Sequence, residues 1–561
     1  MRLRSTLSYN QARNITESYT PSYDPFETRN KRKGSRKDID YTFNSMIFDN
    51  TATLNKFFDR HFVNAVAGAS FTSDKRNFEN IESVNFPDDF VLNNLGSAGS
   101  IQKYSTGGSV SGLESYFFRA NYNYDSKYYF TFTARADKST KFGPNNQWGY
   151  FPSAAVAWRA SHEPFLSELN WLSDLKVRMS VGKTGSANLG DFLYSTFFST
   201  GATNSFHNGQ NGVTLNSVPN PSIRWETTTQ ADFGIDFSLF ENKLRGAFDI
   251  YKKYTRDLLL NVTIPNETGS SSQIMNVGDI SNKGWEFVIG GDLIDKSNLR
   301  LTSDINFSAN RAKLEKLNEG WGTNLKEGDP LGTIYGYQTA GLFRTADEIS
   351  GLNAKSPNGY YQVAKTAPGD LKFVDQNADG YISSSDIVNL GSVEPKFFGG
   401  WNNTLRYKEF EASVLFYFAY GQLLHNAAKG NMEIYNSDKN YYRSILNAWS
   451  PENPNSNQPR IIRTDPNNNA RSSGYLIQDG SFFKLKNLHL AYYINPKKWT
   501  KNQVSQIKVY VSASNLFILT GYDGVDPEVS TSTSAGLMPG GYDSGAYPST
   551  RTMSFGFNIS F

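Results

Sequence analysis

Residues 116–136 read YFFRANYNYDSKYYFTFTARA, and their alternation decides the fold class. One face carries Tyr116, Phe118, Ala120, Tyr122 and Tyr124 before the turn and Tyr128, Phe130, Phe132, Ala134 and Ala136 after it. The other face is mostly Arg, Asn and Thr, and Asp125-Ser126-Lys127 separates the two halves. Successive side chains of a strand point to opposite faces, so this period of two predicts two half-buried strands joined by a tight turn.

The same hairpin pattern recurs along the chain. Further short turns are expected at 241–243, 295–298 and 408–409, and long polar connections at 11–38, 73–112, 184–224, 256–282, 311–397, 421–480 and 518–550. The pattern gives about 16 strands of roughly 9–14 residues, the length that a tilted spanning strand needs. A membrane sorts hairpin connections in this way, with short periplasmic turns and long extracellular loops. The sequence therefore predicts an all-β fold, a transmembrane antiparallel β-barrel.

A β-sandwich, such as a secreted glycan-binding protein, is the alternative interpretation of the aromatic faces. Against it, the second face of these strands is polar, and few helices are expected that could cover the apolar face. No stretch approaches the ~18 consecutive apolar residues of a spanning helix. Phe, Tyr and Trp make up 14% of the chain, which suits strands and membrane-interface girdles. Lipid covers such a face more naturally than protein does.

Composition excludes several classes of function. The formal net charge is +3, so nothing points to a nucleic-acid partner. The chain has no cysteine, which excludes disulfides, Fe–S clusters and thiolate zinc sites, and its five histidines lack metal-ligand spacing. No nucleophile elbow, phosphate-binding loop or singled-out carboxylate pair is present, so we expect no enzyme activity.

A set of segments resembles one known family. In chain order they are RADKSTKFGP (135–144), WGYFP (148–152), LKVRMSVGKTG (175–185), NVGDISNKGWE (276–286), GDLKFVDQNADG (369–380), DGSFFKLKN (479–487), SNLFILTGY (514–522) and DPE (526–528). Each is weak alone, but their order over nearly the whole chain is similar to the SusC/RagA family of TonB-dependent outer-membrane transporters.

The resemblance implies a barrel of about 22 strands with a plugged lumen. It also implies localisation in the cell outer membrane and a lipoprotein lid resembling SusD. The expected function is uptake of oligosaccharides or peptides, powered by the inner-membrane TonB complex acting on the plug.

The chain departs from that family pattern. Signal peptide, TonB box and plug are not visible, so residues 1–561 are expected to be one N-terminally truncated receptor-like barrel without a separate plug domain. About six strands of the full barrel are then missing, and open sheet edges are not tolerated in lipid. We therefore expect a truncated or split gene product, or a second chain that supplies the rest. A passive porin or adhesin barrel and a non-functional fragment remain alternatives.

The sharpest local motif is DQNADGYISSSD (375–386). It matches the spacing of a Ca²⁺ loop, with oxygen ligands at positions 1, 3 and 5, Gly at 6, a backbone carbonyl at 7 and a carboxylate at 12. The expected ligands are Asp375, Asn377, Asp379, Tyr381 and Asp386. Asp rather than Glu at position 12 shortens the reach, and an ion-free, Asx-rich turn is the alternative. A bound ion would act as a structural clip for the loop 311–397.

Two further groups complete the candidate sites. Phe557, Ile559 and Phe561 lie on the apolar face of the last strand and are expected to form a membrane-assembly signal. Trp148, Tyr150, Trp321, Tyr335, Tyr337, Trp401, Tyr441, Tyr442 and Trp449 lie in or beside the expected outer loops. Such aromatics stack on sugar rings, but more often they form girdles or pack loops, so the substrate-binding residues are not predicted.

Overall fold

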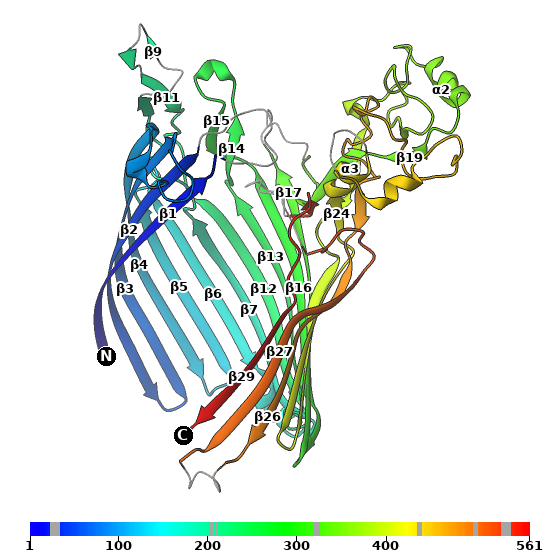
Figure 1. Cartoon of the computed structure of the whole chain (residues 1–561). Coiled ribbons are helices and arrows are strands. Elements are labelled where there is room, and N and C mark those ends of the chain that lie inside the picture. The colour runs from blue at the N-terminus through cyan, green and yellow to red at the C-terminus, as the bar shows by residue number, and fades with distance from the viewer. Residues whose placement is uncertain are drawn as a thin grey trace.

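The structure, a computed structural model, describes residues 1–561 except 23–33, 201–205, 208–209, 212, 318–325, 435–439, 497–502 and 529–539. It is dominated by one antiparallel sheet of 16 strands, each paired with its neighbours in chain order. The sheet curves into a tall wall around a hollow, with β1 at one edge and β29 at the other (Figure 1).

The strands of this sheet are β1 (Arg2–Thr20), β2 (Ser35–Phe58), β3 (His61–Val84), β4 (Ser100–Tyr124), β5 (Tyr128–Ser139), β6 (Trp148–Arg159), β7 (Leu172–Ser186), β12 (Glu226–Leu239), β13 (Leu244–Arg256), β16 (Asp279–Lys296), β17 (Leu299–Lys316), β22 (Phe397–Tyr407), β23 (Phe410–Tyr420), β26 (Phe482–Ile494), β27 (Gln506–Thr520) and β29 (Thr552–Ser560). The all-β class and the number of strands expected from the sequence are confirmed. None of the helices in the described part of the chain is long and apolar enough to cross a membrane.

The strand register keeps the apolar residues on one face of the wall. Tyr122 of β4 is paired with Val63 of β3 on one side and with Phe130 of β5 on the other, and Phe130 is paired with Val156 of β6. The same holds from β1 to β29, where Phe557 is paired with Val509. A register slip of one residue would turn every one of these side chains to the polar face, so the two-residue period fixes the pairing.

The turns at one end of the wall are short. Asp125 and Ser126 between β4 and β5 have φ values of 53° and 54°, the left-handed conformation of the tight hairpin turn that matches strand twist. The long connections lie together at the other end, as Figure 1 shows. The sorting of connections by size, expected from the sequence, is therefore present.

Two of the expected long connections are wrong. β1 continues to Thr20 and β2 begins at Ser35, so the connection predicted at 11–38 is reduced to 21–34. Likewise β3 ends at Val84 and β4 begins at Ser100, which reduces 73–112 to 85–99. These strands also exceed the expected length of 9–14 residues. Beyond the hydrocarbon both faces meet water, so the apolar period disappears while the backbone ladder continues.

The outer loops carry the remaining elements. Short strands are β8 (Phe197–Thr200), β9 (Phe206–His207), β10 (Gln210–Asn211), β11 (Val213–Ser217), β14 (Leu259–Thr263), β15 (Ser272–Asn276), β18 (Thr333–Tyr337), β19 (Thr339–Leu342), β20 (Leu371–Phe373), β21 (Ile387–Ser392), β24 (Leu423–Asn426), β25 (Ile477–Asp479) and β28 (Tyr542–Asp543). The α-helices are α1 (Pro164–Ser167), α2 (Ala346–Asn353) and α3 (Ala427–Glu433), of which α1 belongs to the β6–β7 turn at the opposite end.

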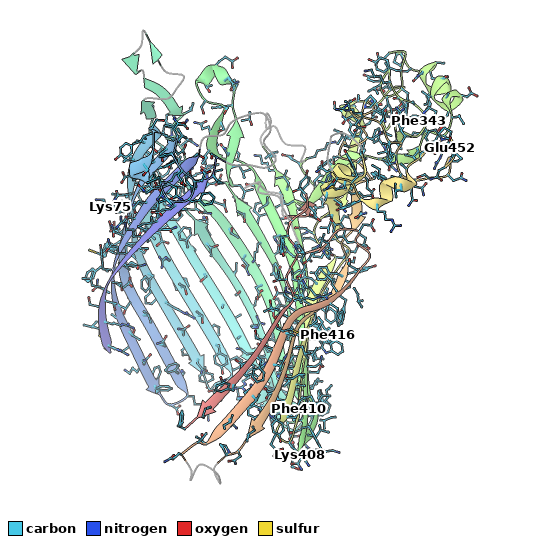
Figure 2. All side chains as sticks on the ribbon, in the orientation of Figure 1. Lys75, Phe343, Lys408, Phe410, Phe416 and Glu452 are labelled. Carbon is cyan, nitrogen blue, oxygen red and sulfur yellow. The ribbon has the colours of Figure 1, made fainter. Side chains whose placement is uncertain are left out.

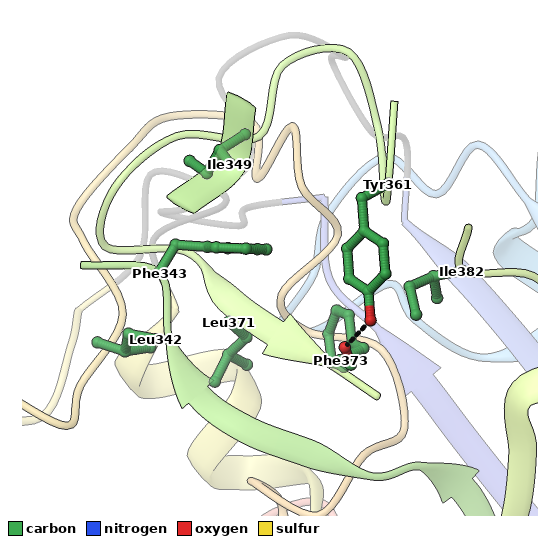
Figure 3. Close-up of a cluster of buried hydrophobic side chains, with 7 residues drawn as sticks. All are labelled: Leu342, Phe343, Ile349, Tyr361, Leu371, Phe373 and Ile382. Carbon is green, nitrogen blue, oxygen red and sulfur yellow. Dashed lines mark hydrogen bonds between the residues drawn. The ribbon is translucent and has the colours of Figure 1, made fainter. Parts of the chain in front are cut away.

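Among the described residues, the largest cluster of buried hydrophobic side chains lies in these loops and not in the wall. The described residues of 326–396 and 421–481 fold together into what we call the loop lobe, at the outer rim (Figure 1). Its core consists of Leu342, Phe343, Ile349, Tyr361, Leu371, Phe373 and Ile382, drawn in Figure 3. Trp449, from the second of the two loops, packs against this core. A wall whose apolar face is covered by lipid has no dry protein core of its own.

Candidate functional site

The hollow side of the wall carries charges that neutralise one another. Arg178 of β7 reaches across β12, where its Nε lies 3.1 Å from Asp236 Oδ2 and its Nη1 lies 2.7 Å from Asp249 Oδ1 of β13. Gly234 of β12 makes room for it, because a Cβ there would lie 2.5 Å from Arg178 Cζ. The glycine thus allows one guanidinium to bridge three strands.

A second network lies on the hollow side near the short-turn end. Glu411 of β23 accepts a hydrogen bond from Arg406 of β22 at 2.8 Å, and Lys508 Nζ of β27 lies 3.6 Å from the same carboxylate. Tyr493 of β26 donates its hydroxyl to Glu411 at 3.2 Å. Charges of this kind are costly against lipid but tolerated against water or protein, so this face lines a lumen.

The opposite face is suited to hydrocarbon. Phe118, Phe130 and Phe132 are 42%, 49% and 48% exposed, as expected for side chains that lipid covers. Figure 2 shows Phe410 and Phe416 along the wall below the loop lobe, with Lys408 at the short-turn end. The wall therefore separates a polar lumen from an apolar surround.

Buried polar contacts join the two long loops of the loop lobe. Asp370 is fully buried, and Arg460 donates to both of its carboxylate oxygens at 2.8 and 3.0 Å. Asn469 also donates to Asp370, at 3.2 Å, and accepts the backbone N–H of Leu371. These contacts connect positions about 90 residues apart, and sequence reasoning missed them because such pairs leave no periodic signal.

A half-buried tyrosine adds a further polar contact within the loop lobe. Tyr475 donates its hydroxyl to Glu433 Oε2 of α3 at 2.8 Å. Burial and the nearby Glu433 carboxylate raise the pKa of Tyr475 above its ordinary value. The phenol therefore stays protonated at neutral pH and keeps this hydrogen bond.

The predicted Ca²⁺ loop lies in the loop lobe as a tightly turned segment. Asp375 Oδ2 accepts a hydrogen bond from the N–H of Gly380 at 2.8 Å. The side chain of Asn377 accepts one from the N–H of Asp379, and the side chain of Asp379 accepts one from the N–H of Tyr381, both at 3.1 Å. Gly380 has φ +92°, which a residue with a side chain rarely adopts. The segment thus has the backbone turn that the spacing predicts.

The carboxylate oxygens of this loop have only in part the free positions that Ca²⁺ ligands need. Asp375 Oδ1 is buried and accepts no hydrogen bond, as expected of a ligand oxygen. Asp386, in contrast, is fully buried, and its two oxygens accept the N–H groups of Gln376 and Ser383 at 2.8 and 2.7 Å. The described residues hold no group of three or more His, Asp or Glu side chains placed around a metal. Calcium binding stays a prediction.

The aromatic residues are divided between the wall and the loop lobe. Trp148 and Tyr150 of β6 stack with each other on the apolar face, and Trp148 stacks on Tyr116. Trp401 of β22 packs against Phe416 on the same face. Tyr337 and Trp449 pack against the core of the loop lobe, and Tyr335 packs against a smaller cluster of Ala312, Leu314 and Leu331 at the end of β17. Tyr441 and Tyr442 belong to the second loop of the loop lobe, and Trp321 is outside the described residues. Girdle and packing roles therefore account for most of this set.

The last strand holds the predicted assembly residues on the apolar face. Phe557 and Ile559 of β29 are paired with Val509 and Ile507 of β27, and are 65% and 43% exposed. Phe561 follows the strand and is 89% exposed. The placement is the one expected, and the assembly role stays a prediction.

This architecture, with lipid-facing strands, a charged lumen face and long loops on one side, is that of an outer-membrane β-barrel. The family model "TonB dependent receptor-like, beta-barrel" matches residues 1–516. The chain belongs to this family of outer-membrane transport proteins, which are not enzymes.

Curated relatives of this chain are named as TonB-dependent receptors. TonB-dependent receptor P3 of Formosa agariphila is 32% identical over 541 residues, which cover 91% of this chain and 52% of the relative. TonB-dependent receptor SusC of Bacteroides thetaiotaomicron is 30% identical over 468 residues, 80% of this chain and 44% of SusC. The chain spans about half the length of the curated relatives it matches.

Among solved structures, the RagAB peptide transporter has the same fold. The match has a TM-score of 0.84 at 24% sequence identity and covers all of this chain and 60% of that chain. The resemblance to the SusC/RagA transporters, stated from the sequence motifs, is confirmed.

Proposed function

We propose that the chain forms wall and outer loops of an importer that takes up oligosaccharides or peptides, together with a SusD-like surface lipoprotein. The observation that carries the proposal is the charged lumen face, on which Arg178, Glu411 and their partners are neutralised within the wall. A lumen of this kind can hold protein or a polar solute. The printed description of one structural relative, the RagAB peptide transporter, supports the peptide class, and the resemblance to the SusC/RagA family supports both classes.

We further propose that import is driven by the TonB complex through a plug, because the family is TonB-dependent. The rival is a passive porin or adhesin barrel with an open lumen. Transport against a gradient distinguishes the two, because a passive pore cannot concentrate a solute. A non-functional fragment would show neither kind of uptake.

Uptake in cells tests the proposal. Cells with and without the gene are grown on single oligosaccharide or peptide sources, and uptake of the labelled solute is measured with and without a protonophore. We expect uptake that needs the gene and is abolished by the protonophore. Gene-dependent uptake that survives the protonophore would favour the passive pore, and no gene-dependent uptake of any tested solute would contradict the proposal. Copurification of a lipoprotein with the tagged chain tests the partner.

We also propose that the loop 375–386 binds Ca²⁺ as a structural clip. The turn at Gly380 and the unpartnered Asp375 Oδ1 support this. Calorimetric titration of the purified chain with CaCl₂ should show binding with a dissociation constant of roughly 10⁻⁴–10⁻³ M, the range of extracellular sites. The double variant Asp375→Asn/Asp379→Asn should lose it, whereas Asp347→Asn on α2 should not. No heat of binding at millimolar Ca²⁺ would reject the clip.

Phe557, Ile559 and Phe561 are proposed to be read by the outer-membrane assembly machinery. Their place on the apolar face of β29, at an edge of the sheet, supports this. Deleting Phe561 should lower the amount of assembled protein in the outer membrane several-fold, measured against Phe240→Ala, which removes an exposed ring from the β12–β13 turn. Equal yields from the two variants would contradict an assembly role.

A further inference from the structure

The last outer loop is described over residues 521–528 and 540–551, and its first part folds back onto the lumen side of the wall. Lys484 of β26 faces the lumen, as does its register partner Tyr417, and its side chain is only 3% exposed. Its Nζ contacts the carboxylate of Glu528 and lies 3.7 Å from Asp526 Oδ2. A lysine is rarely buried unless carboxylates pair with it, so the loop must be seated for Lys484 to be dry.

The loop is attached to the wall at two further places. The register of β23 and β26 shifts between Leu415 and Phe416, which leaves Lys486 as an extra residue of β26, and its Nζ lies 3.5 Å from Glu528 Oε1. Such a bulge re-aims a side chain, here toward the loop. Asn515 of β27 donates its side-chain amide to the carbonyl of Thr550 at 3.0 Å. The loop is therefore held both near Glu528 and close to β29.

The surroundings of Asp526 keep its carboxylate in the charged form that pairs with Lys484. Burial by itself would raise its pKa, but hydrogen bonds from Ser549 and from the N–H of Glu528, with the Lys484 charge, hold the pKa below its usual value. Asp526 Oδ2 accepts the N–H of Ser549 at 3.1 Å. The group therefore stays charged at neutral pH and faces Lys484 as an anion.

The same loop also contacts the loop lobe. β28 pairs in parallel with β24, with Tyr542 opposite His425, and the two rings stack at 4.9 Å. The N–H of His425 donates to the carbonyl of Gly541 at 2.8 Å. Tyr522 donates its hydroxyl to Asp543 at 2.8 Å, which joins the two ends of the loop. A continuous line of contacts thus runs from the wall through this loop to the loop lobe.

We propose that Lys484, Asp526 and Glu528 form a latch that holds residues 521–528 of the last outer loop inside the outer mouth and, through the contact of Tyr522 with Asp543 of β28, fixes the loop lobe to the wall. With the latch closed, β24 and β28 remain paired. With it released, Lys484 and its partners take up water, the loop moves out, and the loop lobe loses this attachment. The latch is independent of the solute that the barrel passes, and its test reads the position of the loop and not uptake.

Cysteine crosslinking in the full chain tests the latch, because the chain has no cysteine of its own. Register partners of neighbouring strands lie within disulfide range, so His425→Cys/Tyr542→Cys should form a disulfide readily in outer membranes treated with a mild oxidant. Adding Lys484→Met should slow its formation at least about tenfold, the size of effect that loss of a 1.4 kcal/mol preference for the seated loop produces. Lys484→Arg should retain the fast rate.

The controls separate loop release from misfolding. Lys408→Met, at the far end of the wall, should leave the crosslinking rate unchanged, and heat-modifiable migration on gels should show that each barrel is folded. If Lys484→Met does not assemble, Asp526→Asn/Glu528→Gln breaks the latch from the loop side and should give the same slow rate. An unchanged crosslinking rate in a folded, latch-broken variant would overturn the proposal, even if uptake were established.

Discussion

Replacing Arg460 by Met should destabilise the loop lobe by about 3–5 kcal/mol, the cost of breaking a buried ion pair from one side. Asp370 would remain at 0% exposure with its charge unpaired, because the guanidinium of Arg460 is the group that donates to both of its oxygens. The remaining donors, Asn469 and the N–H of Ala367, carry no charge. The loss should fall on the contact between the two loops, since Asp370 and Arg460 come from different ones.

Hydrogen exchange in the membrane-embedded protein measures this effect locally. Amides of the core segment 369–373 should exchange more than about 100-fold faster in the variant, while amides of the wall keep their protection. Arg344→Met is the matched control, because Arg344 is exposed and donates to neutral carbonyls of Pro454 and Ser456. Its cost should be about 1 kcal/mol. Equal exchange in both variants would show that the buried pair does not hold the loops together.

Replacing Phe416 by Arg should lower the free energy of unfolding in lipid by about 2–4 kcal/mol, the cost of an arginine on the lipid face near the bilayer midplane. Phe416 packs on Trp401 and Phe483 with ring centroids 5.5 and 5.0 Å away, on the apolar face of β23. The change also removes these ring contacts. Assembly into the outer membrane should fall accordingly.

The matched control is Ser413→Arg, on the lumen face of the same strand. Ser413 is paired with Thr404 and contacts Asn402, so an arginine there would meet polar groups and water. Its free energy of unfolding should stay within about 1 kcal/mol of the unsubstituted protein. Unfolding by urea from lipid vesicles measures both variants. If both substitutions cost the same, the apolar face is not the one that meets hydrocarbon.

The alternation of apolar and polar residues was sufficient to predict the wall. For example, Tyr122 of β4 is paired with Phe130 of β5, which is paired in turn with Val156 of β6. The apolar side chains of neighbouring strands thus meet on one face. The largest errors lie in β1–β4, where strands continue through segments expected to be loops, and β16 and β17 also extend a few residues into predicted connections. Above the membrane both faces are wet, so a strand there has no apolar period by which sequence could reveal it.

The candidate sites were less accessible to prediction. The loop 375–386 was found because its spacing is local, and its turn at Gly380 is present. The Arg178 network, the Asp370–Arg460 pair and the latch at Lys484 were all missed. Their members are 71, 90 and 44 residues apart, and nothing in the sequence near one residue identifies its partner.

The sequence by itself determined the lipid-facing surface and the side on which the loops gather, because both follow from each residue's own polarity and the two-residue repeat of a strand. Only the tertiary structure decided how the loops fold onto each other and onto the lumen face. Those contacts depend on which strands are adjacent and on the stagger between them, so the charges of Lys484 and Glu528 meet only once the wall has been assembled.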